Sequence, residues 1–277
     1  MILSTGARWL LRLAAAAVLT FIYAPLALVL LNSFSTSVTF AWPPPGYTLR
    51  WWQAAASNEG VRTALVTSVE VALAAALIAV VLGTLASMAL VRYEFFGRDA
   101  VSLLVLLPIA LPGIVTGIAL NTLFTQALGG LTFFTLVVGH ATFCIVIVVN
   151  NASARLRRMS STAEEASLDL GANYWQTFWR VTLPNLRLPI IGAALLIFTL
   201  SMDEIAVSFF LIGRDNTLPL EIWSRLRRGM TPEINAISTV IFVFSLIAIV
   251  LWYRLRARSE GQPELGAELV EAAASGH

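Results

Sequence analysis

The sequence contains no lysine, and all 18 of its basic residues are arginines. A phosphate-binding loop of the Gly-x4-Gly-Lys type needs a lysine, so this chain does not carry that nucleotide-binding site. Its single cysteine, Cys144, excludes a disulfide within the chain. No nucleophile–base pair and no cluster of metal-ligating residues emerges, so we expect no enzyme active site, metal or cofactor in this chain.

Charge is scarce and apolar residues dominate. Only 12% of the residues are charged, 58% are hydrophobic, and the mean hydropathy is +0.80. Crossing a bilayer as a helix takes roughly 20 apolar residues, and the lipid core requires the backbone to bond within its own segment. The sequence therefore predicts an all-α integral membrane protein with six transmembrane helices, at about residues 9–31, 63–91, 101–124, 131–150, 188–212 and 236–253.

The arginines predict the orientation in the membrane. An even number of spans leaves both termini on one side. With both termini in the cytoplasm, twelve arginines lie on the inner side and six on the outer side, as the positive-inside rule requires. The cluster of Arg225, Arg227 and Arg228 runs against this bias. The basic isoelectric point, about 9.0, reflects arginines at helix ends and does not indicate nucleic-acid binding.

A polar segment separates the fourth and fifth spans. Ser161 and Glu164 have the spacing of a capping box, so we expect a helix to begin there. Gly171 supplies the permissive backbone that ends it. We expect a second short helix to follow and Pro184 to end it before the fifth span. That second helix carries an aromatic stripe of Tyr174, Trp175, Phe178 and Trp179.

The spacing within this segment resembles the signature loop of the transmembrane subunits of type I ATP-binding-cassette (ABC) importers. The matching residues are Glu165, Ala166, Gly171, Leu183 and Pro184, while Ser167 and Val181 stand where the family has alanine and isoleucine. In that family the loop is a cytoplasmic coupling helix that inserts into a cleft of the ATP-binding subunit. The resemblance implies the same docking role for this segment.

The resemblance extends to three further stretches, residues 46–52, 107–117 and 200–204, which are similar to polyamine-type permeases. It is strongest to the second permease subunit of putrescine/spermidine importers. It implies a first helix and periplasmic loop over residues 1–60 and a permease core over 61–256. We expect the acidic residues 257–277 to form a disordered cytoplasmic tail.

The same resemblance implies ATP-driven alternating access, with this chain forming half of the pathway for a small cationic solute such as a polyamine. The implied partners are two ATP-binding subunits, which use ATP and Mg, a second and non-identical permease subunit, and an extracytoplasmic solute-binding protein. The implied location is the bacterial cytoplasmic (inner) membrane, with the lipid bilayer as surroundings and no nucleic acid.

Asp203 and Glu204 are the candidate pathway residues, because ionisable groups inside a span are costly and face protein or water. Adjacent helical residues point about 100° apart, so both cannot face one pore. We hypothesise that one carboxylate borders the solute path and attracts a protonated amine, while the other pairs with a neighbouring helix. The alternative is that both serve helix packing.

Four residues, Pro108, Pro112, Gly113 and Gly117, are predicted to shape the third span. Proline bends a helix, and Gly113 and Gly117 form a small-xxx-small face that allows close packing. A hinge role is the alternative to packing. His140, in the fourth span, is predicted to make a hydrogen bond between helices rather than bind a metal.

Two other functions remain open at this point. One is an ABC importer permease for another solute, such as iron(III) or sulfate, since the binding protein usually sets specificity. The other is a secondary transporter or channel that works alone, which predicts inverted repeats with broken helices. The sequence shows no convincing internal repeat. A purely scaffolding membrane subunit is the weakest alternative.

Overall fold

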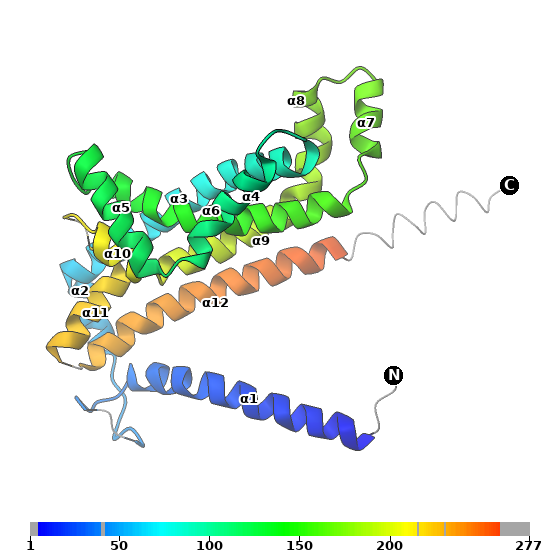
Figure 1. Ribbon diagram of the computed structural model, residues 1–277. Helices are drawn as coiled ribbons and strands as arrows, with labels where there is room; N and C mark the ends of the chain where they lie inside the picture. The colour runs from blue at the N-terminus through cyan, green and yellow to red at the C-terminus, as the bar shows by residue number, and fades with distance from the viewer. Residues whose placement is uncertain (1–4, 40–41, 215, 230, 261–277) are drawn as a thin grey trace. The chain divides into compact units, whose positions relative to one another are not determined.

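The computed structural model describes residues 5–39, 42–214, 216–229 and 231–260. Apart from an isolated bridge between Ser35 and Tyr47, the regular structure of these residues is helical. The chain forms two compact units, one from Met1–Thr63 with Glu221–Val243 and the other from Ala64–Leu220 with Phe244–His277. Figure 1 labels the helices. The predicted tail, residues 257–277, lies mostly outside the described residues.

Five helical stretches are long and apolar enough to cross a membrane, and a bent pair makes up to six. Four of them are α1 (Thr5–Asn32), α3 (Glu59–Arg92), α6 (Phe133–Arg158) and α12 (Pro232–Glu260). The fifth runs from Tyr174 to Met202 through α8, a π-helical segment and α9. The predicted all-helical class, with up to six spans, is confirmed.

The third predicted span is not one straight helix. It consists of α4 (Arg98–Ala110) and α5 (Gly113–Ala127), which are bent by 110° at the break between them (Figure 1). Leu111 is extended, as expected for a residue before proline, and Pro112 has no N–H with which to continue the helix. Pro108 lies inside α4, so the break is at Pro112 alone.

The fifth span differs from its prediction at both ends. The segment α8 (Tyr174–Thr177) continues through π-helical residues Phe178–Thr182 into α9 (Leu183–Met202). Pro184 therefore does not end a helix. It lies where the π-helical segment passes into α9, inside the continuous helical stretch Tyr174–Met202. The predicted continuation to residue 212 breaks at Asp203, and the chain resumes as the short helix α10 (Ala206–Leu211).

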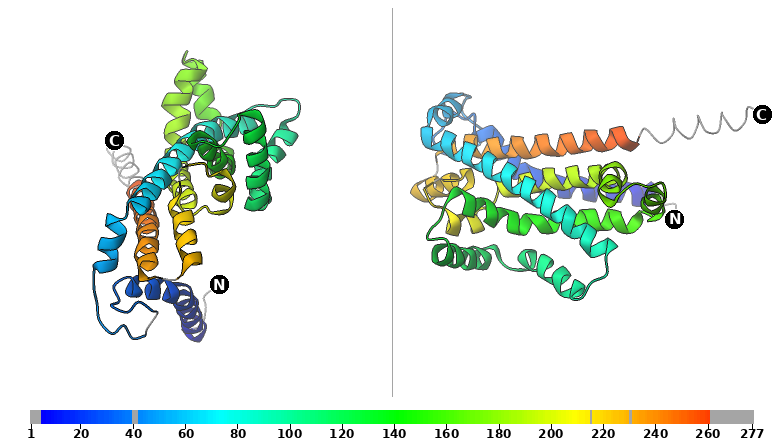
Figure 2. Two further views of the ribbon diagram at one scale, coloured as in Figure 1. Left: turned by 90° about the vertical axis from the view of Figure 1, so that its left-hand side faces the viewer. Right: turned by 90° about the horizontal axis from the view of Figure 1, so that it is seen from above.

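Helix α6 forms the centre of the larger unit. Its Cys144 and Val148 are fully buried against alanines of α3 and against Ala193 and Ile197 of α9. Figure 2 shows α6 and α9 side by side. Close approach relies on glycine: a Cβ on Gly83 of α3 would lie 2.6 Å from the Val148 side chain. Cys144 is thus a small, fully buried side chain in an apolar cluster.

The smaller unit explains the arginine cluster that ran against the orientation rule. It contains α2 (Arg50–Ser57) and most of α11 (Leu218–Arg228). Arg225 is paired with both Glu221 and Glu233, at 2.8 Å each. Two carboxylates therefore pair with the first arginine of the cluster, which reduces the weight of the cluster in a count of positive charges.

Candidate functional site

The predicted coupling segment is a pair of short helices at the end of α6 and α9 (Figure 1). Helix α7 (Thr162–Asp169) is followed by Gly171, whose φ of +87° is the left-handed conformation that glycine tolerates. The amides of Gly171 and Ala172 donate to the carbonyls of Leu168 and Ser167, which is a Schellman termination. The prediction that Gly171 ends the first helix is confirmed.

The predicted capping box at the start of α7 is wrong. Ser161 has helical backbone angles and its side chain caps nothing. Glu164 instead turns away from the backbone: its Oε2 lies 2.9 Å from Nε of Arg92, and its Oε1 accepts from the Thr182 hydroxyl at 2.8 Å. The charge of the Arg92 guanidinium and the hydrogen bond from Thr182 take the place of the predicted bond to the backbone amide.

A capping box does occur one helix later, where the sequence reasoning missed it. The Asn173 side chain accepts from the Gln176 amide at 2.8 Å, and the Gln176 side chain accepts from the Asn173 amide at 3.0 Å. The Asn-x-x-Gln spacing after Gly171 was the available signal. Together with the bond between the Ser167 and Thr177 hydroxyls, 3.0 Å, it fixes α8 against α7.

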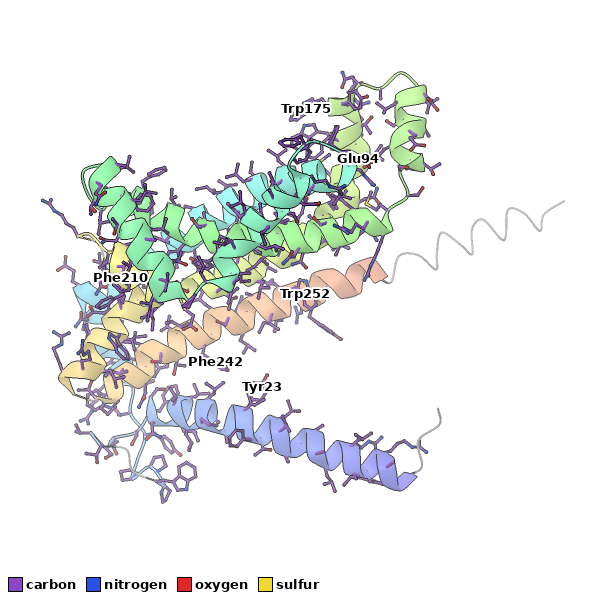
Figure 3. All side chains as sticks on the ribbon, in the orientation of Figure 1. Tyr23, Glu94, Trp175, Phe210, Phe242 and Trp252 are labelled. Atoms are coloured by element: carbon purple, nitrogen blue, oxygen red, sulfur yellow. The ribbon has the colours of Figure 1, made fainter. Side chains whose placement is uncertain are left out.

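The outer surface of this segment is apolar and exposed. Trp175, Phe178 and Trp179 contact one another, with ring centroids 5.3 to 5.7 Å apart, and Figure 3 shows Trp175 at the end of the segment. Trp175 is 64% exposed and Leu170 is 89% exposed. Glu165 and Ala166 are exposed as well. Exposed apolar side chains gathered in this way mark an interaction surface.

Asp203 and Glu204 lie at the break between α9 and α10 rather than inside a helix. The Glu204 carboxylate accepts from the Val207 amide at 2.8 Å, which caps the start of α10. Asp203 is exposed, and among the described residues its side chain makes no hydrogen bond or ion pair. The two carboxylates therefore have different surroundings.

The break in α9–α10 lies against the break in α4–α5. A Cβ on Gly113 would lie 3.1 Å from the Ala206 side chain, and a Cβ on Gly117 would lie 2.8 Å from the Phe210 ring. The Asn121 amide donates to the Phe210 carbonyl at 2.6 Å, and Phe210 is labelled in Figure 3. Gly113 and Gly117 thus pack against α10.

His140 connects the two sides of the α9–α10 break. Its Nδ1 lies 2.7 Å from the Ser201 hydroxyl of α9, and its Nε2 lies 2.8 Å from the Ser208 hydroxyl of α10. The side chain is 1% exposed. In a neutral imidazole one nitrogen donates and the other accepts. The predicted hydrogen bond between helices is confirmed, and it holds both helices beside Asp203.

A groove of about 850 Å³ runs between the end of α6, one face of α9 and α12. It was not predicted. Gly192 and Thr199 of α9 line it, and Asp203 follows the last residue of that helix without being one of the residues that line the groove. At one end the Arg155 guanidinium donates to the Asn185 carbonyl at 3.3 Å. The lining residues include Asn151, Arg155, Arg158, Asn185, Leu188, Leu195, Ala248 and Ile249.

Trp252 of α12 forms part of one wall of this groove, and its position on that helix is labelled in Figure 3. A Cβ on Gly192 would come within 2.5 Å of its indole Nε1. Glycine at 192 is therefore what allows the indole to lie against α9. A glycine in the middle of an apolar helix was the sequence signal for this close approach.

Comparison with known proteins relates these features to a family. The family described as "Binding-protein-dependent transport system inner membrane component" matches residues 79–261. The putrescine transport system permease protein PotI of Escherichia coli is 34% identical over 253 residues, covering 88% of this chain and 89% of the relative. The spermidine/putrescine permease PotC of the same species is 34% identical over 236 residues, covering 84% and 89%.

A more distant relative is a permease described as putative for 2-aminoethylphosphonate, PhnV of Salmonella paratyphi A. It is 28% identical and covers 87% of this chain and 91% of its own length.

Solved structures agree on the fold. A chain of a bacterial ABC transporter that imports alginate superposes with a TM-score of 0.67, covering 93% of this chain and 99% of that one at 17% identity. The methionine transporter MetNI gives 0.58, covering 72% and 98% at 17% identity. The family match and the two 34% relatives together establish that this chain belongs to the binding-protein-dependent transport system inner membrane components.

Proposed function

We propose that this chain is a permease subunit of an ATP-driven importer of polyamines. The observation that carries the proposal is the 34% identity to permeases of putrescine and spermidine/putrescine systems, over more than four fifths of each chain. The chain would lie in the bacterial inner membrane with both termini in the cytoplasm. The coupling segment would then lie on the cytoplasmic side.

Asp203 is the proposed contact for the solute. The amines of a polyamine resemble that of lysine and are protonated at neutral pH. An exposed carboxylate at the break after α9, with no hydrogen bond or ion pair to the other described residues, suits such a cation. Glu204 is less available because it caps α10. Of the two hypothesised roles, we assign the pathway to Asp203 and the structural role to Glu204.

The coupling segment would receive ATP-driven movement from outside the chain. Its exposed Glu165 and Ala166 lie on α7, and Gly171 forms the turn beside them. Leu183 and Pro184 begin α9, so a displacement of the segment acts directly on the helix that leads to Asp203. Docking can bias the alternating-access equilibrium only as far as the contacts differ between states.

The remaining partners follow from this role. Two ATP-binding subunits would bind ATP and Mg and dock on the coupling segments. A second, non-identical permease subunit would complete the groove, and an extracytoplasmic binding protein would deliver the solute. The breaks at Pro112 and Asp203 would provide the flexible points between the two orientations of the pathway.

A solute that carries an anionic group is the second candidate. Arg155 and Arg158 lie at one end of the groove, where two guanidinium groups repel a polycation and favour a phosphonate or phosphate. The 28% relative is described as a putative permease for such a compound. Uptake measurements with both kinds of solute distinguish the two candidates.

The test is ATP-dependent uptake by the complete complex in proteoliposomes, with putrescine, spermidine and 2-aminoethylphosphonate as labelled solutes. We expect uptake of a polyamine. Asp203→Asn should raise its KM by about tenfold, since a hydrogen bond to a charged group contributes about 1.5–3 kcal/mol. Glu94→Gln is the matched control, because Glu94 is an exposed carboxylate outside the groove (Figure 3).

Uptake of 2-aminoethylphosphonate without uptake of either polyamine would favour the anionic solute over the polyamine. Unchanged polyamine kinetics in Asp203→Asn would contradict the pathway role of that residue. Transport by this chain without an ATPase would contradict the proposal that it is a subunit of an ATP-driven importer.

A further inference from the structure

Glu164 is the one acidic residue of α7 that turns inward. Its neighbour Glu165 is exposed, whereas the Glu164 side chain is 15% exposed and the Arg92 side chain 19%. Glu164 contacts two elements outside α7: Arg92, the last residue of α3, and Thr182, the last residue of the π-helical segment. Three elements of the larger unit therefore meet at one carboxylate.

The charges at this junction suit the helices that carry them. Arg92 lies in the last turn of α3 and Glu164 in the first turn of α7, where a cation and an anion respectively are stabilised by the helix dipole. The Arg92–Glu164 distance is 2.9 Å, although the N–H direction does not meet hydrogen-bond geometry. We therefore treat it as a charge pair, partly shielded from solvent.

The end of α3 is fixed from a second side as well. The Arg98 guanidinium, at the start of α4, donates to the Leu90 carbonyl at 2.8 Å. At the opposite end of the same helix, the Ser68 hydroxyl accepts from the Leu218 amide at 2.8 Å. Ser68 and Arg92 are separated by about 36 Å along a helix. Helix α3 thus connects Glu164 of the coupling segment with Leu218, the first residue of α11.

We propose that Arg92 and Glu164 are positioning residues for coupling. Through this pair, movement of α7 reaches α3, in addition to the movement that the chain itself carries into α9. The inference rests on the proposed function of the coupling segment. The covalent connection alone carries movement from the segment into α9. The Arg92–Glu164 pair adds α3, which has no covalent route to α7 other than through α4, α5 and α6.

The experiment uses the assembled complex with its ATPase and binding protein, with putrescine and spermidine as solutes. The variants are Glu164→Gln, Arg92→Gln, Thr182→Val and the exchange of both charges, Arg92→Glu with Glu164→Arg. Arg157→Gln, which removes an exposed arginine at the end of α6, is the matched control. Three quantities are measured: the amount of ATPase that co-purifies, the ratio of stimulated to basal ATP hydrolysis, and uptake.

We expect Glu164→Gln and Arg92→Gln to assemble normally and to lower the stimulation ratio and uptake by at least about fivefold, the lower end of coupling between sites in proteins. Thr182→Val should have a smaller effect in the same direction. The exchanged pair should recover part of the loss, which two unrelated residues would not do. Recovery is incomplete because both charges then oppose the helix dipoles and the Thr182 hydroxyl loses its acceptor. Arg157→Gln should match the wild type.

Single variants that keep the wild-type stimulation ratio, or an exchanged pair no better than the single variants, would overturn the inference. The proposed function and the role of the Arg92–Glu164 pair are tested by different measurements. Wild-type uptake tests the proposed function. The ratio of variant to wild-type ATP hydrolysis tests the Arg92–Glu164 pair, even where the solute is not a polyamine.

Discussion

The two ends of the helical stretch Tyr174–Met202 are held by different chemistry. At the coupling end, a charge pair and side-chain caps hold the segment, through Glu164, Asn173 and Ser167. At the other end, the neutral His140 bridge between two serines holds α9 to α10 in a fully buried position. Charges are inexpensive where solvent reaches them, and neutral hydrogen bonds suit the apolar interior.

The difference has a functional meaning. The coupling end presents its apolar side chains outward and ties its polar groups inward, as an interaction surface requires. The far end buries its polar bridge and leaves one carboxylate, Asp203, exposed beside it. One helical stretch therefore joins an exposed apolar surface, the proposed docking site, to the exposed carboxylate of Asp203.

The largest effect should come from breaking the buried bridge. His140→Ala leaves the Ser201 and Ser208 hydroxyls without this partner, at a cost of about 1–3 kcal/mol for each buried group. We expect a clear fall in the Tm of the purified protein in detergent. Thr142→Val is the control, since the Thr142 hydroxyl bonds only within its own helix. An unchanged Tm in His140→Ala would contradict the role of the bridge.

The next effect concerns the turn of the coupling segment. Gly171→Ala places a Cβ in a left-handed conformation, which costs about 1–2 kcal/mol, so the docking geometry should be disturbed and stimulated ATP hydrolysis lowered. Gly129→Ala is matched to it: φ is +74° and both sites have open space around them. If the two variants reduce stimulation equally, the effect is backbone strain and not docking.

A smaller effect is expected at the other end, at the cap of α10. Glu204→Ala removes the acceptor for the Val207 amide and should lower stability by about 1 kcal/mol. Glu204→Gln keeps an oxygen acceptor, so it should retain most of the wild-type stability and leave solute uptake nearly unchanged. Urea unfolding of both variants measures the difference. A loss of uptake in Glu204→Gln would move Glu204 into the pathway beside Asp203.

The smallest effect should come from Ser167→Ala, which restores the residue found in the importer family. It removes the bond to the Thr177 hydroxyl, a contact worth about 0.5–1.5 kcal/mol. The helix propensity of alanine offsets part of that loss. We expect stimulated ATP hydrolysis close to the wild type. A large loss would indicate that α7 and α8 depend on this bond for their arrangement.

Much of the fold was predictable because long apolar runs determine the membrane spans directly. Gly171 and Pro112 were also predictable, because each interrupts a helix through the conformation of its own backbone. The capping box at Ser161 was predicted wrongly because the preferred partner of Glu164 is Arg92, 72 positions earlier in the chain. Local spacing contains no information on such a partner. The break at Asp203 was missed for a related reason: Ser201 and Ser208, on its two sides, bond to His140, 61 and 68 positions earlier in the chain.

The site was predictable in outline only. The motif at Glu165 and Gly171 places the coupling segment from sequence alone. The groove could not be anticipated, because it arises from three helices and from the contact of Trp252 with Gly192. The different surroundings of Asp203 and Glu204 could not be predicted either, because the sequence does not indicate which of two adjacent carboxylates bonds to the Val207 amide.

The π-helical segment Phe178–Thr182 has a consequence for the phase of the helix around it. A π turn accommodates one surplus residue, which rotates everything beyond it by about 100° relative to an uninterrupted α-helix. This surplus residue sets the angle between Trp175, which precedes the segment, and the face of α9 that lines the groove. Removing one residue from the segment would keep both surfaces intact and aim them in different directions.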